Sequence, residues 1–255
     1  MKQASSIETH AGPAGSSEHE HEIYRPKHRV RIVTATSLFD GHDVAINIFR
    51  RILQESGAEV IHLGHNRSVD EIVSAAIEED VQGIAVSCYQ GGHMEFFKYI
   101  IDLLKERGAS HVRLFGGGGG VIVPEEVREL EAYGVAKIYT PEHGAAWGLQ
   151  GIINHLMSEV DRPVPAGTGD PVDGLSPENK GAVARLITMA ETARKKRGAE
   201  YERVMKLIRE KAGSRVMPVI GMAGTGGAGK SSLIDELVVR LLRDFGDIHV
   251  AVLCS

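Results

Sequence analysis

A regular alternation of short apolar runs and amphipathic stretches over residues 29–158 constrains the fold of this chain most strongly. The apolar runs are rich in β-branched residues, and they predict strands at 30–36, 59–63, 83–87, 112–115 and 137–139. Apolar residues at helical spacing predict helices at 44–55, 69–79, 94–107, 125–132 and 143–157. These β-α repeats indicate a parallel sheet covered on both faces, and their combined length suits the flavodoxin-like (Rossmann-type) strand order 2-1-3-4-5.

The rest of the sequence divides around this α/β domain, which we place at residues 28–160. Residues 1–27 are polar and are expected to form a disordered tail. Residues 161–214 begin with a segment rich in proline and glycine and continue with two polar helices at about 177–197 and 199–212, as in a linker. Residues 215–255 predict a second α/β unit, with a strand at 219–223, a helix at 231–243 and a strand at 249–254. One such unit cannot bury both faces of its sheet, so we expect the sequence to be part of a longer protein.

The composition excludes several classes of protein. Hydrophobic residues make up 42% and charged residues 25% of the chain, and the net charge of −5 provides no basic field for nucleic acid or anionic membranes. The two cysteines, Cys88 and Cys254, are too few for a disulfide framework, which predicts a reducing, cytoplasmic compartment. No apolar run reaches the roughly 18 residues of a transmembrane helix.

A histidine follows the first expected strand, two residues after an aspartate, in the triplet Asp40-Gly41-His42. Such a carboxylate can hold one ring N–H while the other ring nitrogen binds a metal. In the expected strand order, the loops after strands one, three and four meet at one edge of the sheet, where ligands bind. The second of these loops carries Ser87 and the glycine pair 91–92, and the third is the run Gly116–Gly120. A histidine beside two loops without side chains indicates a metal-bearing ligand with a long appendage.

These motifs resemble the cobalamin-binding domain of adenosylcobalamin-dependent acyl-CoA mutases over about residues 28–158. The resemblance implies that cobalamin binds base-off/His-on, with His42 as the lower axial cobalt ligand and Asp40 holding the far ring nitrogen. It also implies that the displaced nucleotide tail passes beside Ser87 and the glycine loops. The cofactor-binding residues implied in this way are Asp40, Gly41, His42, Ser87, Tyr89, Gly91, Gly92, Gly117, Gly118, Gly119 and Gly120.

The sequence departs from the family pattern at a few positions. The usual glycine three residues after the histidine is Ala45, and the usual leucine two residues after the serine is Tyr89. Val123 resembles a one-residue insertion, which leaves open which two glycines of Gly116–Gly120 line the tail. The residues near strand ends that we interpret as surface, supporting or packing groups are His62, His65, His93 and Cys88.

The second α/β unit contains a phosphate-binding motif. Residues 224–231 fit G-x-x-x-x-G-K-S between an expected strand and an expected helix, so that backbone N–H groups can cradle phosphates. Lys230 would reach the β and γ oxygens, and Ser231 would bind Mg²⁺. The nucleotide-binding residues predicted by this motif are Gly224, Gly226, Gly227, Ala228, Gly229, Lys230, Ser231 and Ser232. The segment resembles small GTPase chaperones that escort cobalamin into acyl-CoA mutases. That resemblance implies GTP, whereas the residues alone do not separate GTP from ATP.

The order of the two modules resembles the fused isobutyryl-CoA mutases. The resemblance implies an isomerase that interconverts isobutyryl-CoA and n-butyryl-CoA by radical chemistry, together with GTP hydrolysis that assists cofactor loading. The acyl-CoA would be bound by a TIM-barrel domain outside this sequence, so no catalytic residue is expected here. The family also implies a homodimer.

Three alternatives stay open. A corrinoid methyl carrier of the methionine synthase type shares the Asp-x-His motif, but it normally has a helical cap domain before the motif. A cobalamin subunit of the methylmalonyl-CoA mutase type also shares the motif, but in that mutase the cobalamin domain follows the barrel. A phospho-receiver shares the expected sheet but needs an aspartate where this chain has Ser87.

Overall fold

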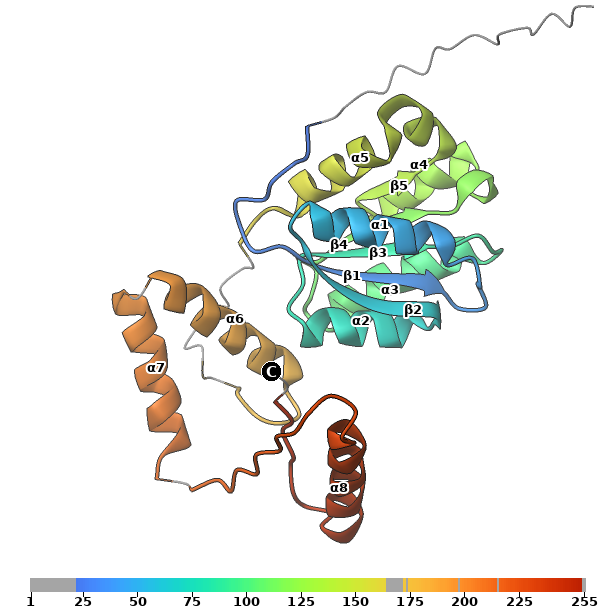
Figure 1. Cartoon of the computed structure of the whole chain (residues 1–255). Coiled ribbons are helices and arrows are strands. Elements are labelled where there is room, and N and C mark those ends of the chain that lie inside the picture. The colour runs from blue at the N-terminus through green and yellow to red at the C-terminus, as the bar shows by residue number, and fades with distance from the viewer. Residues whose placement is uncertain (1–21, 164–171, 173, 197, 215, 254–255) are drawn as a thin grey trace, which may run out of the picture. The chain divides into compact units, whose positions relative to one another are not determined.

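The computed structural model describes residues 22–163, 172, 174–196, 198–214 and 216–253. They belong to two units, Met1–Pro165 and Ala166–Ser255, which we describe separately. The first unit is a five-stranded parallel sheet in the order β2-β1-β3-β4-β5, with helices on both faces (Figure 1). The predicted flavodoxin-like order is therefore confirmed. Among the described residues, no helix has both the length and the apolar character needed to cross a bilayer.

Every strand and helix expected in the first unit is present. The strands are β1 (Arg31–Ser37), β2 (Glu59–Arg67), β3 (Gly83–Ser87), β4 (Arg113–Gly117) and β5 (Lys137–Tyr139). The helices are α1 (Val44–Glu55), α2 (Val69–Glu78), α3 (His93–Glu106), α4 (Pro124–Tyr133) and α5 (Pro141–Val160), with a 3-10 turn η1 (Gly119–Val121). The largest difference from prediction is the greater length of β2 and α5.

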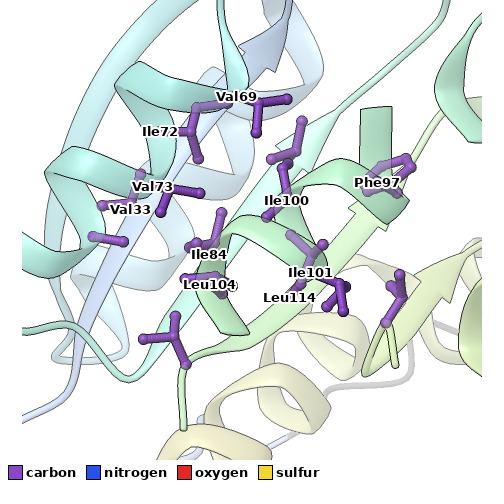
Figure 2. Close-up of a cluster of buried hydrophobic side chains, with 14 of the residues drawn as sticks. Val33, Val69, Ile72, Val73, Ile84, Phe97, Ile100, Ile101, Leu104 and Leu114 are labelled. Atoms are coloured by element: carbon purple, nitrogen blue, oxygen red, sulfur yellow. The ribbon is translucent and has the colours of Figure 1, made fainter. Parts of the chain in front are cut away.

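The sheet separates two apolar cores because successive side chains of a strand point to opposite faces. Val33 and Leu114 belong to the core that α2, α3 and α4 cover (Figure 2). Ile32 and Phe115 belong to the core that α1 and α5 cover. Because the central strands are buried on both faces, their sequences are nearly continuous apolar runs.

Edge strand β2 continues beyond the apolar run that predicted it. Gly64 has a φ of 83°, and the pairing with β1 shifts register near this point. Residues 65–67 are polar and resemble a loop in the sequence, but the irregularity lets the strand continue. α2 then begins at a capping box, in which the Ser68 hydroxyl accepts the Glu71 amide and the Glu71 carboxylate accepts the Ser68 amide.

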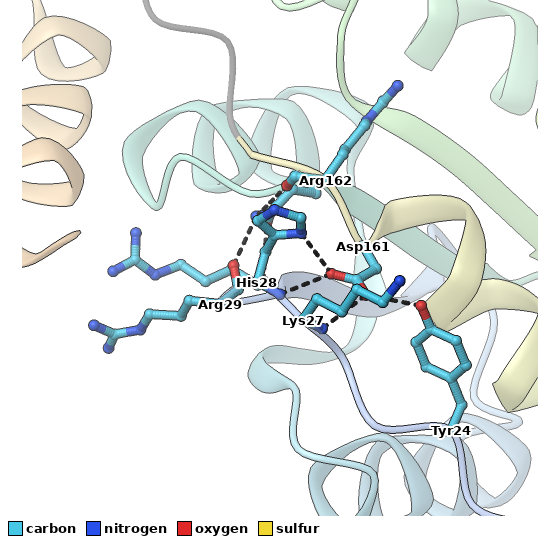
Figure 3. A network of polar contacts seen from close by, with 8 residues as sticks. Tyr24, Lys27, His28, Arg29, Asp161 and Arg162 are labelled. Carbon is cyan, nitrogen blue, oxygen red and sulfur yellow. Dashed lines mark hydrogen bonds and ion pairs between the residues drawn. The ribbon is translucent and has the colours of Figure 1, made fainter. Parts of the chain in front are cut away.

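The segment before β1 packs against the domain (Figure 3). The Asp161 carboxylate, directly after α5, accepts hydrogen bonds from the Tyr24 hydroxyl (2.7 Å), the Lys27 amide (2.8 Å) and both the amide and the ring of His28 (2.9 Å each). This packing departs from the expectation of a disordered tail over 1–27, because a buried acceptor far along the sequence satisfies the donors of residues 24–28. Residues 1–21 lie outside the described residues.

The second unit contains α6 (Lys180–Lys196), α7 (Ala199–Ala212) and α8 (Lys230–Asp244). α6 and α7 pack on each other, with Leu186 and Val204 buried. Within residues 216–253, as far as they are described, no strand forms, so the strands predicted at 219–223 and 249–254 are wrong here. A strand needs a neighbouring backbone to pair with, and Val219 and Ile220 are instead 89% and 76% exposed. Cys254 lies outside the described residues.

Candidate functional site

His42 lies in the loop between β1 and α1, at the carboxyl edge of the sheet. Its Nδ1 atom is 2.8 Å from Oδ1 of Asp40, and its backbone N–H donates to the same oxygen over 2.9 Å. The Asp40 side chain is fully buried, whereas 73% of the His42 side chain is exposed. Because the carboxylate accepts, Nδ1 carries the ring proton of the neutral imidazole, and Nε2 keeps its lone pair. The pair can therefore present one oriented nitrogen ligand to a metal ion.

Asp40 is itself fixed by a second loop. Its Oδ2 atom accepts the backbone N–H of Tyr89, from the loop after β3, over 2.5 Å. Burial alone would raise the pKa of Asp40, but the hydrogen bonds from Tyr89 and His42 outweigh burial and hold that pKa below its ordinary value. The carboxylate is therefore ionised near neutral pH and joins the loops that follow β1 and β3.

A cavity of about 320 Å³ lies on the face of the sheet that α1 and α5 cover. Its lining comes from α1, β3, β4, β5, α5 and the loops at their ends: Ala45, Ile46, Phe49, Ala85, Val86, Ser87, Tyr89, Phe115, Gly116, Gly117, Gly118, Gly119, Tyr139, Thr140, Pro141, Gly144, Leu149, Ile152 and Leu156. Most of these side chains are apolar, and Ser87, Tyr89, Tyr139 and Thr140 add hydroxyl groups. A slot of this kind fits a flat, largely apolar group with a few polar atoms at its edge.

Within the five-glycine run, the protein itself requires the absence of a side chain at particular positions. A Cβ atom at Gly118 would lie 2.0 Å from the carbonyl oxygen of Cys88, and one at Gly119 would lie 2.9 Å from the Tyr89 ring. A Cβ atom at Gly120 would meet nothing within 4 Å. Residues 116–119 line the cavity, so the glycines that border it are the first four of the run.

The structure brings together most of the residues of the predicted cofactor site. Ser87, Tyr89 and residues 117–119 line the cavity, and the Tyr89 ring centroid lies 5.6 Å from that of His42. Asp40, Gly41, His42, the pair 91–92 and Gly120 do not line it, although they lie in the same loops. The sequence analysis did not single out the α5 wall, Leu149, Ile152 and Leu156, or Phe49 of α1. These residues belong to the apolar faces of α1 and α5. The helical spacing of apolar residues would have indicated them if both faces had been placed against the same side of the sheet.

The predicted phosphate-binding residues lie in the loop that leads into α8. Gly227 and Gly229 have φ values of 75° and 79°, and the Nζ atom of Lys230 donates to the carbonyl oxygens of Gly224 and Thr225 over 2.7 Å each. No side chain caps the N-terminus of α8, where Ser231 and Ser232 follow Lys230. The first-turn N–H groups of this helix can therefore serve an anion.

Two family models match the chain. A B12 binding domain matches residues 30–145, and the methylmalonyl Co-A mutase-associated GTPase MeaB matches residues 183–254. A 2-hydroxyisobutanoyl-CoA mutase small subunit from Aquincola tertiaricarbonis is 34% identical over 109 residues, which cover 43% of this chain and 79% of that protein. The chain belongs to the B12-binding acyl-CoA mutase family.

Fused isobutyryl-CoA mutases are similar to this chain through both modules. The enzyme from Geobacillus kaustophilus (strain HTA426) is 60% identical over 235 residues, covering 91% of this chain and 22% of that protein. The one from Cupriavidus metallidurans is 54% identical over 229 residues, which cover 89% of this chain and 20% of that protein. The chain thus spans about a fifth of the length of these relatives. These matches confirm the predicted resemblance and the predicted cofactors, cobalamin and GTP with Mg²⁺, and they favour a fused mutase over the alternatives.

Proposed function

We propose that this chain supplies the cobalamin-binding and GTP-binding modules of an adenosylcobalamin-dependent mutase that interconverts isobutyryl-CoA and n-butyryl-CoA. The observation that carries the proposal is the buried Asp40 carboxylate orienting an exposed His42 beside an apolar cavity. When bound, the coenzyme supplies the radical chemistry of the rearrangement, and the protein positions it. The similarity to fused isobutyryl-CoA mutases supports the choice of substrate.

Each group in the first unit has a role in this proposal. His42 binds cobalt through Nε2, and Asp40 holds Nδ1 and keeps the ring in one tautomer. The apolar walls of the cavity take the displaced nucleotide tail, with the Ser87 hydroxyl available to its polar edge. The Tyr89 ring lies close to both His42 and Gly119, and the glycines at 91–92 and 117–120 keep the loops free of side chains.

In the second unit, the phosphate loop binds GTP. Lys230 exchanges the two loop carbonyls for phosphate oxygens, and Ser231 binds Mg²⁺. The backbone N–H groups of residues 226–229 and of Ser232 donate to the phosphates. Hydrolysis then favours one conformation of the protein over another and so assists cofactor loading.

The proposal extends to the complete protein. A TIM-barrel domain outside this sequence binds the acyl-CoA, and the protein is a cytoplasmic homodimer. Light scattering of the complete protein tests the dimer. A monomer at working concentration would contradict that part of the proposal and would leave the cobalt ligand unaffected.

The axial ligand is tested by electron paramagnetic resonance of bound cob(II)alamin, with histidine labelled by ¹⁵N. We expect hyperfine splitting from one protein nitrogen in the wild type and its loss in His42→Ala. His65→Ala is the matched control, because His65 is an exposed histidine at the end of β2 and should leave the spectrum unchanged. The same labelled nitrogen in the His42→Ala spectrum would refute the assignment.

A further inference from the structure

His93 is a buried histidine that the proposed function does not use. It stands at the start of α3, directly after the loop that follows β3, and is 7% exposed. Its Nδ1 atom lies 3.3 Å from the carbonyl oxygen of Gln90, and its Nε2 atom lies 2.9 Å from Oε2 of Glu126 in α4. The ring therefore bridges the loop after β3 and the beginning of α4.

The partners of His93 determine which hydrogens its ring carries. The Gln90 carbonyl only accepts, so Nδ1 must donate, and an ionised carboxylate only accepts, so Nε2 must donate as well. The same Oε2 atom of Glu126 also accepts the Val123 amide over 3.0 Å. That hydrogen bond and the one from His93 hold the pKa of Glu126 below its ordinary value, so the carboxylate is ionised at neutral pH. An imidazole with a hydrogen on each nitrogen is a cation.

The surrounding helices explain why the cation needs this carboxylate. The N-terminus of α3 carries partial positive charge, which opposes a cation at its first residue. Glu126 lies in the first turn of α4, where the same effect favours an anion. The carboxylate of Glu126 thus offsets both the burial of His93 and the field of α3.

The two ends of this bridge are connected to the loops that border the cavity. On one side, Gln90 follows Tyr89, whose amide holds Asp40. On the other side, Val123 follows the glycine run and η1. We infer that His93 is a positioning residue for the cobalamin site: as an imidazolium it joins the loop that fixes Asp40 to the segment that ends the glycine run. The charge follows from the partners of the ring alone, whereas the positioning role rests on the proposed function.

The charge is tested on the full chain without cobalamin, by nuclear magnetic resonance of ¹⁵N-labelled histidine rings at neutral pH. We expect two protonated ring nitrogens for His93, assigned by the signal that disappears in His93→Gln. In Glu126→Gln the carboxylate is gone, and we expect one of the two ring protons to be lost. A single protonated nitrogen on His93 in the wild type would overturn the inference.

The positioning role is tested by titrating the same chains with cob(II)alamin. We expect Glu126→Gln to weaken binding by roughly 10-fold, the lower end of the effect known for partners in direct contact with a metal ligand, because Glu126 acts through His93 and the loop that fixes Asp40. Glu129→Gln is the matched control, because Glu129 binds Lys98 (2.5 Å) between the same helices but one turn farther from the loops. Equal affinities of the two variants would overturn the role. Failure of the wild type to bind cob(II)alamin would instead refute the proposed function and the role with it, while the ring-proton result would stand.

Discussion

His42 and Lys230 each come directly after a glycine, but different partners hold them. His42 is oriented by a buried carboxylate that is itself held by an amide from another strand's loop. Among the described residues, Lys230 donates to two carbonyl oxygens of its own loop. The first arrangement is a tertiary property of the folded sheet, and the second is local to the motif. We therefore expect changes in the first unit to affect stability together with binding, and changes in the phosphate loop to affect chemistry alone.

The largest expected effect is in the phosphate loop. Lys230→Ala removes the cation that would stabilise the β and γ phosphates, and we expect GTP hydrolysis by the complete protein to fall by about 10²–10³-fold. In the described part of the chain, the Lys230 amino group donates to the carbonyl oxygens of two exposed residues, so the thermal unfolding midpoint should stay within the error of the wild type. Steady-state phosphate release and differential scanning calorimetry measure the two quantities.

Lys211→Ala provides the control for the loss of one positive charge, because Lys211 is an exposed lysine at the end of α7. It should leave hydrolysis unchanged. A large drop in the unfolding midpoint of Lys230→Ala would show that the loop lysine is structural, and the contrast between the two regions would then be lost.

The next effect tests how tightly the first unit encloses its glycine run. In Gly118→Ala, the new Cβ atom would meet the Cys88 carbonyl oxygen at 2.0 Å, so the backbone must shift, and we expect a loss of about 3 kcal/mol in the free energy of unfolding. Gly120→Ala places its Cβ atom in open space and should change stability by less than about 0.5 kcal/mol. Urea denaturation followed by the fluorescence of Trp147, the single tryptophan, reports on this unit.

Similar stabilities for the two glycine variants would mean that the loop after β4 yields readily. The glycine run would then be a flexible segment that adapts to its ligand. The first unit and the phosphate loop would then no longer differ as a site held by contacts between separate loops and a site held within one loop.

Periodicity was sufficient to predict the first unit, because its signals are local. Helical spacing and β-branched runs give each element, and the known preference of small parallel sheets gives their order. The polar end of β2 was missed because register with β1, and not apolar character, sustains residues 64–67 as a strand. The strands predicted at 219–223 and 249–254 failed for the complementary reason, since an apolar run forms a strand only where another backbone pairs with it.

The candidate site was likewise predictable only where its contacts are local in the sequence. Asp40 and His42 are two residues apart, so their contact follows from the triplet. The amide of Tyr89 on Asp40 and the burial of His93 depend on how separate loops meet, and the sequence analysis placed His93 among the surface or supporting groups. No local pattern carries that information.

The smallest expected effect concerns another tertiary contact of the first unit, the Asp161 carboxylate that holds residues 24–28. Burial alone would raise the pKa of Asp161, but hydrogen bonds from Lys27, Tyr24 and His28 outweigh it and lower the pKa from 3.8 to about 2. Because the folded value lies below the unfolded one, the carboxylate stabilises the fold fully above pH 3.8, and this contribution is lost as the pH falls towards 2. It amounts to about 2 kcal/mol at neutral pH.

In Asp161→Asn, we therefore expect the unfolding free energy at neutral pH to be lower by about 2 kcal/mol and its decline between pH 4 and pH 2 to be correspondingly shallower. Tyr24→Phe removes one of the donors, keeps the charge, and should cost about 1 kcal/mol. Urea titrations at several pH values measure both. An unchanged acid limb in Asp161→Asn would show that the segment before β1 is held by its apolar contacts instead. Polar contacts between residues far apart in the sequence would then contribute little to the stability of the first unit. The expected difference between this unit and the phosphate loop would be lost.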